Sequence, residues 1–179
     1  MKSSIKVATL FMLAGMSGMA AANDTKSTVS LGYAFSNYKG NLSGNSPGAN
    51  IKYNWEDLNS KWGVIGSVTR TSSDLKINNS DLKGSISHLS VLAGPSYAVS
   101  DMVSLYGLVG ISHDRIKFPS EIGGADSVNS FAYGAGVRVT PISNWSVDLS
   151  YENMRNNRSE KTSEPLKIGT WAIGVGYSF

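Results

Sequence analysis

The sequence contains no cysteine and only two histidines among its 179 residues. No disulfide can therefore cross-link the chain, and the usual cysteine and histidine ligands of structural zinc sites are missing. After the first 22 residues, no stretch approaches the roughly 20 consecutive apolar residues of a transmembrane helix. Nineteen glycines are spread through the apolar segments, and each would weaken a helix by about 1 kcal/mol relative to alanine. The missing cysteines, the scarce histidines, the lack of long apolar runs and the many glycines argue against a disulfide-rich, zinc-binding or helical protein.

The first 22 residues have the composition of a secretory signal peptide. Lys2 and Lys6 precede an apolar run that is too short to cross a bilayer as a helix. Small residues permit cleavage after Ala20 or after Ala22. The alternative is an uncleaved anchor helix. The sequence predicts an exported chain with the signal peptide in residues 1–22 and the mature domain in residues 23–179.

The mature part would carry almost no net charge. Cleavage after Ala22 removes two of the 16 lysines and arginines and none of the 13 acidic residues, which leaves 157 residues with a net charge of +1. This length corresponds to one domain, and the charge gives no reason to expect a nucleic-acid partner.

Strict alternation is the main positive signal. The last nine residues place apolar or aromatic side chains at every second position, with small or weakly polar residues between them. The apolar positions are Trp171, Ile173, Val175, Tyr177 and Phe179. A period of two indicates a β-strand. A final aromatic after alternating hydrophobics resembles the C-terminal signal that the barrel-assembly machinery of outer membranes reads.

Seven earlier segments repeat this alternation. They occupy residues 29–36, 50–56, 62–68, 88–97, 103–111, 130–139 and 145–152. The connections between the eight segments alternate in length: short and turn-like at 57–60, 99–101 and 141–144, and longer and polar at 39–47, 71–81, 119–127 and 156–166. Lipid outside and polar residues inside is the arrangement of a membrane barrel. The sequence predicts an all-β, eight-stranded antiparallel transmembrane β-barrel with short periplasmic turns and four longer extracellular loops.

The alternation also places five charged residues inside the predicted barrel: Lys52, Glu56, Arg138, Asp148 and Glu152. An eight-stranded barrel is filled by its own side chains, and an unpaired buried charge is expensive. We therefore expect these charges to pair with one another and to specify the fold. The functional alternative is an ion path, which would make the protein a pore.

A second set of charged residues lies near the long-loop ends of the strands and continues the lipid-facing rows. This set, the basic collar, consists of Lys39, Arg70, Lys83, Arg115, Lys117, Arg155 and Lys167. Such a collar would contact lipopolysaccharide phosphates or host polyanions. The alternative is that these are ordinary rim residues whose charged ends reach out of the apolar layer.

The sequence offers little for catalysis. His113 lies beside Ser112 and Asp114, but neighbours in a strand point to opposite faces, so these three cannot form a relay. His88 is the other histidine, and no clustered carboxylates suggest a metal site. We expect no catalytic, cofactor or metal site. An outer-membrane lipase or acyltransferase is the enzyme alternative.

Six stretches carry a family resemblance: WGVIGSV (62–68), GPSY (94–97), VSLYGLVG (103–110), AYGAGV (132–137), VDLSYE (147–152) and IGTWAIGVGYSF (168–179). They resemble the enterobacterial Ail/Lom family, whose relatives include OmpX, PagC and Rck. The resemblance covers essentially the whole mature chain and implies a bacterial outer-membrane location. It also implies virulence functions of the surface loops: attachment to host cells, invasion and serum resistance. The implied partners are host-cell surface, extracellular-matrix or complement-regulatory proteins. The alternative is a structural or envelope-stress barrel without a host ligand, which contacts lipopolysaccharide.

Overall fold

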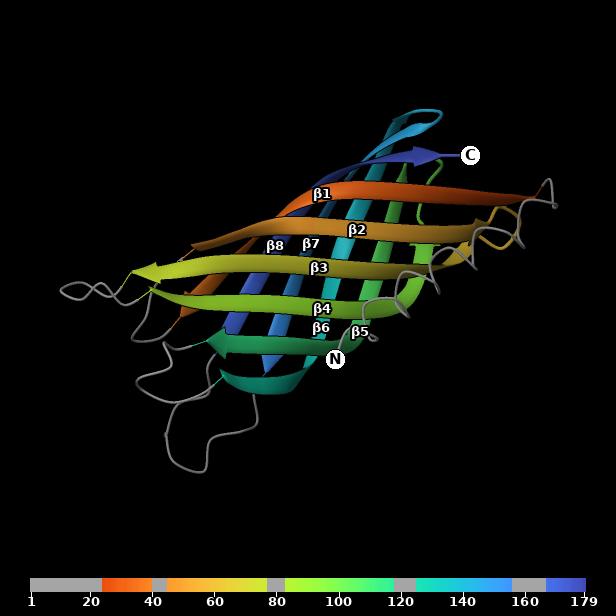
Figure 1. The fold of residues 1–179 in the computed structure, drawn as a ribbon. Coiled ribbons are helices and arrows are strands. Elements are labelled where there is room, and N and C mark those ends of the chain that lie inside the picture. Colours follow the sequence, from red (N-terminus) through yellow and green to blue (C-terminus); the bar gives the residue numbers. More distant parts are fainter. Residues whose placement is uncertain (1–23, 40–44, 77–82, 118–124, 156–166) are drawn as a thin grey trace.

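A computed structural model describes residues 24–39, 45–76, 83–117, 125–155 and 167–179. These residues form a closed antiparallel barrel in which each strand pairs with the next and β1 pairs with β8 (Figure 1). The strands are β1 (Thr25–Lys39), β2 (Asn45–Asp57), β3 (Trp62–Lys76), β4 (Lys83–Ala98), β5 (Val103–Lys117), β6 (Ala125–Ile142), β7 (Trp145–Arg155) and β8 (Lys167–Ser178). The predicted eight-stranded barrel is confirmed. Within the described ranges, no helix is long and apolar enough to cross a membrane.

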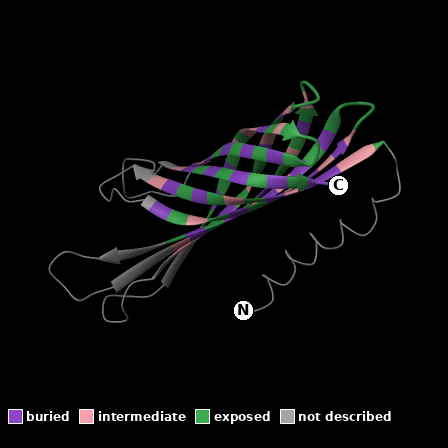
Figure 2. Ribbon diagram, turned by 90° about the horizontal axis from the view of Figure 1, so that it is seen from above, coloured by how far each residue is buried: buried purple, intermediate pink, exposed green. Residues whose placement is uncertain are grey.

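The alternation in the sequence becomes an alternation of environment along every strand. Figure 2 shows buried and exposed residues following one another as stripes across the barrel. Leu31 and Ile111 are 62% and 69% exposed on the outside, whereas Asn54 and Thr69 are fully buried inside. An apolar outer wall around a polar interior is the reverse of a soluble domain and is what a lipid surround requires.

The strands extend further than the sequence pattern indicated. They contain 11 to 18 residues, whereas a membrane-crossing strand needs about 9–11. Part of each of three predicted long loops is strand, since β2 begins at Asn45, β3 continues to Lys76 and β6 begins at Ala125. These predicted loop boundaries were wrong because polar residues were taken for loop residues. Serine, threonine and asparagine continue a strand wherever a neighbouring strand supplies backbone partners, as β4 does for residues 71–76.

The predicted turn at 141–144 was also too long. Ile142 still pairs with Trp145, and the register of β6 and β7 shifts between Val139 and Ile142. A β-bulge of this kind adds a residue to one strand without ending the pairing. The fourth predicted long loop, residues 156–166, lies outside the described residues.

The two terminal strands close the barrel through regular backbone pairing. The register of β1 and β8 runs from Thr28 opposite Ser178 to Lys39 opposite Lys167. Beyond it, the N–H of Ser27 donates to the carbonyl of Phe179 at 3.0 Å, and the N–H of Phe179 donates to the carbonyl of Ser27 at 2.9 Å. A closed barrel leaves no open sheet edge, which is the condition for strands to cross a membrane.

Candidate functional site

The centre of the barrel holds one compact charged cluster. Asp148 on β7 accepts hydrogen bonds from Lys52 Nζ at 2.6 Å, from Tyr106 Oη at 2.8 Å and from Arg138 Nη2 at 3.3 Å. All four side chains are buried. Gly174 is the Cα partner of Asp148 on β8, and it leaves the inner wall free of a side chain there. The cluster therefore ties β2, β5, β6 and β7 together across the interior.

Glu152 has a different environment. Its carboxylate accepts hydrogen bonds from the hydroxyls of Ser90 at 2.9 Å, Thr69 at 3.0 Å and Ser67 at 3.4 Å. Asn50 in turn donates to the Ser67 and Thr69 hydroxyls at 3.0 and 2.8 Å. Among the described residues, no cation forms an ion pair with Glu152. Hydroxyl donors from two neighbouring strands, β3 and β4, satisfy this buried carboxylate instead.

Mutual pairing of all five interior charges was therefore wrong. The structure buries all five and brings Lys52, Arg138 and Asp148 together. It places Glu152 among hydroxyls and leaves Glu56 without an ion pair in the described part of the chain. For Glu152 the physical reason is that hydroxyls on small inner positions solvate a carboxylate without requiring a cation nearby.

Apolar side chains fill another part of the interior. They come from β3 to β7 and form one cluster of buried residues: Ile65, Leu92, Tyr106, Leu108, Ala132 and Met154. Together with the charged cluster they occupy the lumen, as expected for a barrel of eight strands. A lumen filled by side chains in this way argues against an ion path through the barrel.

We expect planar bilayers containing the folded protein to show no discrete conductance steps, because the side chains of the two clusters block the lumen. The measurement is a single-channel recording on protein whose folded state has been checked by its heat-dependent shift in gel mobility. Reproducible steps of uniform size in the folded, unheated sample would contradict a filled lumen and restore the ion-path interpretation.

One polar pair was missed by the sequence reasoning. His88 on β4 is the Cα partner of Asp114 on β5, and His88 Nδ1 lies 2.7 Å from Asp114 Oδ1. The His88 side chain is buried inside the barrel. Ala98 and Ser104 are Cα partners beside the turn between β4 and β5. His88 lies ten positions before Ala98, and Asp114 lies ten positions after Ser104. Counting outward from this turn would therefore have found the pair.

Neither histidine forms part of a hydrolytic triad in the described chain. His113 faces outward, where its Nδ1 lies 2.7 Å from Asn129 Oδ1. Ser112 is buried, and its hydroxyl donates to the carbonyl of Ser130. No group of three or more histidines and carboxylates among the described residues is placed to hold a metal ion.

Six members of the basic collar lie within two residues of the strand ends opposite the short turns, whereas Arg70 lies six residues before Lys76, the last residue of β3. The Arg70 side chain is exposed and that of Arg115 is half-buried. The remaining five members are the terminal residues of their strands at this end: Lys39, Lys83, Lys117, Arg155 and Lys167. Lys167 is the Cα partner of both Lys39 and Arg155, so three basic residues stand side by side on β1, β8 and β7. We call Lys39, Lys167 and Arg155 the basic row.

Aromatic pairs mark both ends of the apolar wall. Trp62 contacts Tyr97 with ring centroids 5.0 Å apart, and Trp145 contacts Tyr177 at 5.3 Å, both on the short-turn side. Towards the collar, Tyr151 contacts Trp171 at 4.8 Å. Interfacial aromatics of this kind flank the apolar band of membrane barrels. The predicted insertion-signal residues Trp171, Ile173, Val175, Tyr177 and Phe179 all face outward; their recognition by the assembly machinery stays a prediction.

A closed barrel with an apolar wall, aromatic ends and a filled polar interior defines an outer-membrane β-barrel protein. Residues 7–179 match the model of the outer membrane protein beta-barrel domain family. The chain belongs to this family, in the branch that includes Ail, OmpX and PagC.

Several relatives align over nearly the full length. The chain is 35% identical to the attachment invasion locus protein of Yersinia enterocolitica, covering 100% of both chains. It is 37% identical to outer membrane protein X of Enterobacter cloacae, covering 97% of this chain and 99% of that protein. Among solved structures, Ail of Yersinia pestis in complex with the heparin analogue sucrose octasulfate is 37% identical, with a TM-score of 0.72 over 87% of this chain and 99% of that one. The protein is therefore a bacterial outer-membrane barrel, as predicted, and not an enzyme.

Proposed function

We propose that this protein attaches the bacterium to host surfaces, and that its collar and four surface loops bind sulfated or phosphorylated polyanions there. The observation that carries the proposal is the concentration of basic residues at the collar end of the barrel. The heparin analogue bound to the Ail structure supports this ligand class. Invasion, binding of extracellular-matrix proteins, and serum resistance through complement-regulatory proteins belong to the same proposal, with the loops as their site.

The chemistry of the collar suits this ligand. A guanidinium offers a fork of N–H donors that matches the oxygens of sulfate and phosphate. Arg70 is the exposed arginine on β3, and Arg115 lies two strands away on β5. Charges at an exposed rim are screened by salt, with a Debye length of about 8 Å at physiological ionic strength. Binding through the collar should therefore weaken as salt is raised.

The experiment is adherence with a matched charge reversal. We expect a non-adherent laboratory bacterium that displays the protein to bind epithelial cells, and the Arg70→Glu/Arg115→Glu variant to lose about tenfold or more of this binding and of its affinity for sucrose octasulfate. Each hydrogen bond to a charged group contributes about 1.5–3 kcal/mol, and the reversal adds repulsion. Lys61→Glu, an exposed change in the turn at the opposite end, should leave both unchanged. Equal adherence of all three strains would contradict the proposal.

The second candidate function is a structural or envelope-stress role in which the collar contacts lipopolysaccharide and no host ligand exists. It is favoured by the relatives that are named only outer membrane protein X, at 34–37% identity. Absence of any adherence gain, with surface display confirmed and lipopolysaccharide still retained, would support this role over attachment.

We also infer that residues 1–22 are a cleaved signal peptide and residues 23–179 the mature domain. The segment lies outside the described residues. The mass of the protein extracted from outer membranes tests the inference, since cleavage after Ala20 and cleavage after Ala22 give different masses and an uncleaved anchor gives the full-length mass.

A further inference from the structure

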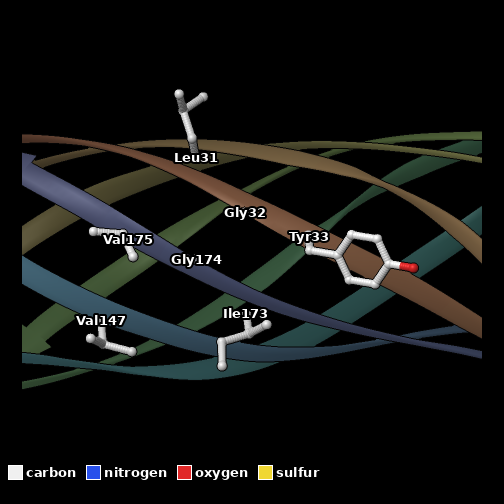
Figure 3. Close-up of a pocket in the computed structure, with 7 residues that line it drawn as sticks. All are labelled: Leu31, Gly32, Tyr33, Val147, Ile173, Gly174 and Val175. Carbon is white, nitrogen blue, oxygen red and sulfur yellow. The ribbon is translucent and has the colours of Figure 1, made fainter.

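The barrel has an apolar outer wall whose two ends determine how deeply it sits in the membrane. Figure 3 shows the middle of this wall where β1 meets β8, with the side chains of Leu31, Tyr33, Val147, Ile173 and Val175. No charged residue lines this part of the wall. The middle therefore faces hydrocarbon, and the depth of the barrel depends on where the apolar surface stops at each end.

The two aromatic pairs on β7 and β8 are too close together to bound the whole apolar band. The pairs Trp145–Tyr177 and Tyr151–Trp171 lie six residues apart on both strands. With a rise of about 3.4 Å per residue and a strand tilt of about 40°, they are separated by roughly 16 Å along the membrane normal. The apolar band of such barrels is about 25 Å tall, so it extends beyond at least one of the pairs.

At the collar end, the outward rows stop in polar side chains. Arg70 on β3, His113 on β5 and Asn129 on β6 are all exposed. Leu89 is the Cα partner of both Arg70 and His113, and His113 is the Cα partner of Asn129. Polar residues thus follow one another around this part of the wall, and they leave little apolar surface beyond them in the described strands.

At the opposite end, apolar side chains continue to the short turns. Val99, one residue past the end of β4, is 54% exposed. Its N–H donates to the carbonyl of Val103 at 2.9 Å, so the pairing of β4 with β5 extends to this residue. Three more large apolar residues at the short turns are more than half exposed: Leu58, Met102 and Ile142.

The outward row of β4 shows that this extra surface is needed to fill the band. The row runs from Leu89 to Tyr97 within the strand and continues to Val99 with the same parity. Its length along the membrane normal is roughly 21 Å up to Tyr97 and roughly 26 Å up to Val99, with the same rise and tilt. Only the longer row matches an apolar band of about 25 Å.

The polar side chains of the turns are hydrogen-bonded within the turns themselves. The Asp57 carboxylate accepts a hydrogen bond from the Ser60 hydroxyl at 3.0 Å. The Ser100 hydroxyl accepts one from a backbone N–H at 3.2 Å, and the Asn144 amide donates one to a backbone carbonyl at 2.9 Å. These groups satisfy one another while the apolar side chains project outward, which suits surroundings poorer in water than the bulk solvent.

We propose that the short turns lie in the interfacial layer of the periplasmic phospholipid leaflet, anchored there by Leu58, Val99, Met102 and Ile142. Their apolar surface continues the lipid-facing wall, which favours phospholipid over a protein partner. The exposed charges of Lys61 and Asp101 are solvated by headgroups in this layer. The anchoring concerns the end opposite the collar, so it is independent of any ligand at the bacterial surface.

The test compares two positions that each lie two residues beyond an exposed aromatic of an outward row. Val99 follows Tyr97 at the short-turn end, and Asn129 precedes Phe131 at the collar end. The chain contains no cysteine, so Val99→Cys and Asn129→Cys can each carry a single nitroxide spin label. The labelled proteins are folded into dioleoyl-phosphatidylcholine vesicles, and collisions are measured with oxygen and with a water-soluble nickel chelate present on both sides of the membrane.

We expect oxygen collisions to predominate at Val99→Cys and nickel collisions at Asn129→Cys, because the polar chelate is excluded from the apolar layer. Equal collision ratios at the two positions, or predominance of nickel at Val99→Cys, would overturn the proposal. So would spin–spin broadening at Val99→Cys, which would place a second copy of the chain at the turns. If Val99→Cys lacks the heat-dependent gel shift, Met102→Cys replaces it in the same turn.

A second measurement needs no label. Val99→Ser/Met102→Ser removes apolar surface from one turn, whereas Asn59→Ser/Asp101→Ser changes only polar residues of the turns. Hydrophobic mismatch costs a fraction of a kcal/mol per Å, so we expect the first variant to lower the folded-to-unfolded ratio in urea about tenfold in dioleoyl vesicles and by less than about twofold in thinner dilauroyl vesicles. The second variant should match the native protein in both. An equal loss in both vesicles would reflect damage to the fold and overturn the anchoring role.

Discussion

Asp148→Asn is expected to lower the free energy of unfolding by about 3–5 kcal/mol, because it leaves two buried cations without a counter-charge. The native carboxylate is fully buried and accepts hydrogen bonds from Lys52, Arg138 and Tyr106. Asparagine keeps the shape but removes the charge. The measurement is urea unfolding of the barrel in lipid vesicles, followed by tryptophan fluorescence.

Two further variants show whether charge or volume is responsible. Lys52→Met should destabilise much less than Asp148→Asn, because Arg138 and Asp148 then remain as a balanced pair. Asp101→Asn, an exposed change in the turn between β4 and β5, should stay within about 0.5 kcal/mol of the native protein. If Lys52→Met and Asp148→Asn cost the same, packing rather than charge balance would explain the cluster.

Gly94→Val is expected to prevent the barrel from closing. A Cβ at Gly94 would collide with the carbonyl oxygen of Gly107 on β5, and backbone cannot give way as a flexible side chain can. Gly94 and Pro95 make no ladder pair with β5, and proline has no N–H to donate to a ladder. The backbones of β4 and β5 therefore lie close together there without regular ladder pairing. We expect a loss of several kcal/mol and no folded band on an unheated denaturing gel.

Gly66→Val is the matched control. A Cβ at Gly66 meets no atom within 4 Å, since the position lies on the outward row of β3. We expect this variant to fold and to keep the heat-dependent mobility shift. Were both glycine variants to fold equally well, the close approach of β4 and β5 at Gly94 would not limit assembly. If neither folds, the cost would come from valine in these strands generally.

The sequence alone decided which face each residue takes. A side-chain period of two is a local property of a strand, so alternation by itself placed Lys52, Arg138 and Asp148 inside the barrel and the apolar positions of the last strand outside. The same pattern indicated the strand number and the antiparallel order, since alternating short and long connections leave no other simple path. Strand ends were less well determined, because polar residues occur both in extended strands and in loops.

The tertiary structure decided which inward or outward residues meet. Ser90 and Glu152 are 62 positions apart in sequence, and Lys52 and Asp148 are 96 apart. Contacts across the lumen depend on the register of every intervening pair and on barrel closure, and alternation contains no information on either. For this reason the hydroxyl shell of Glu152 became visible only in the folded barrel, whereas the His88–Asp114 pair lies on adjacent strands and could have been found by counting from the turn between β4 and β5.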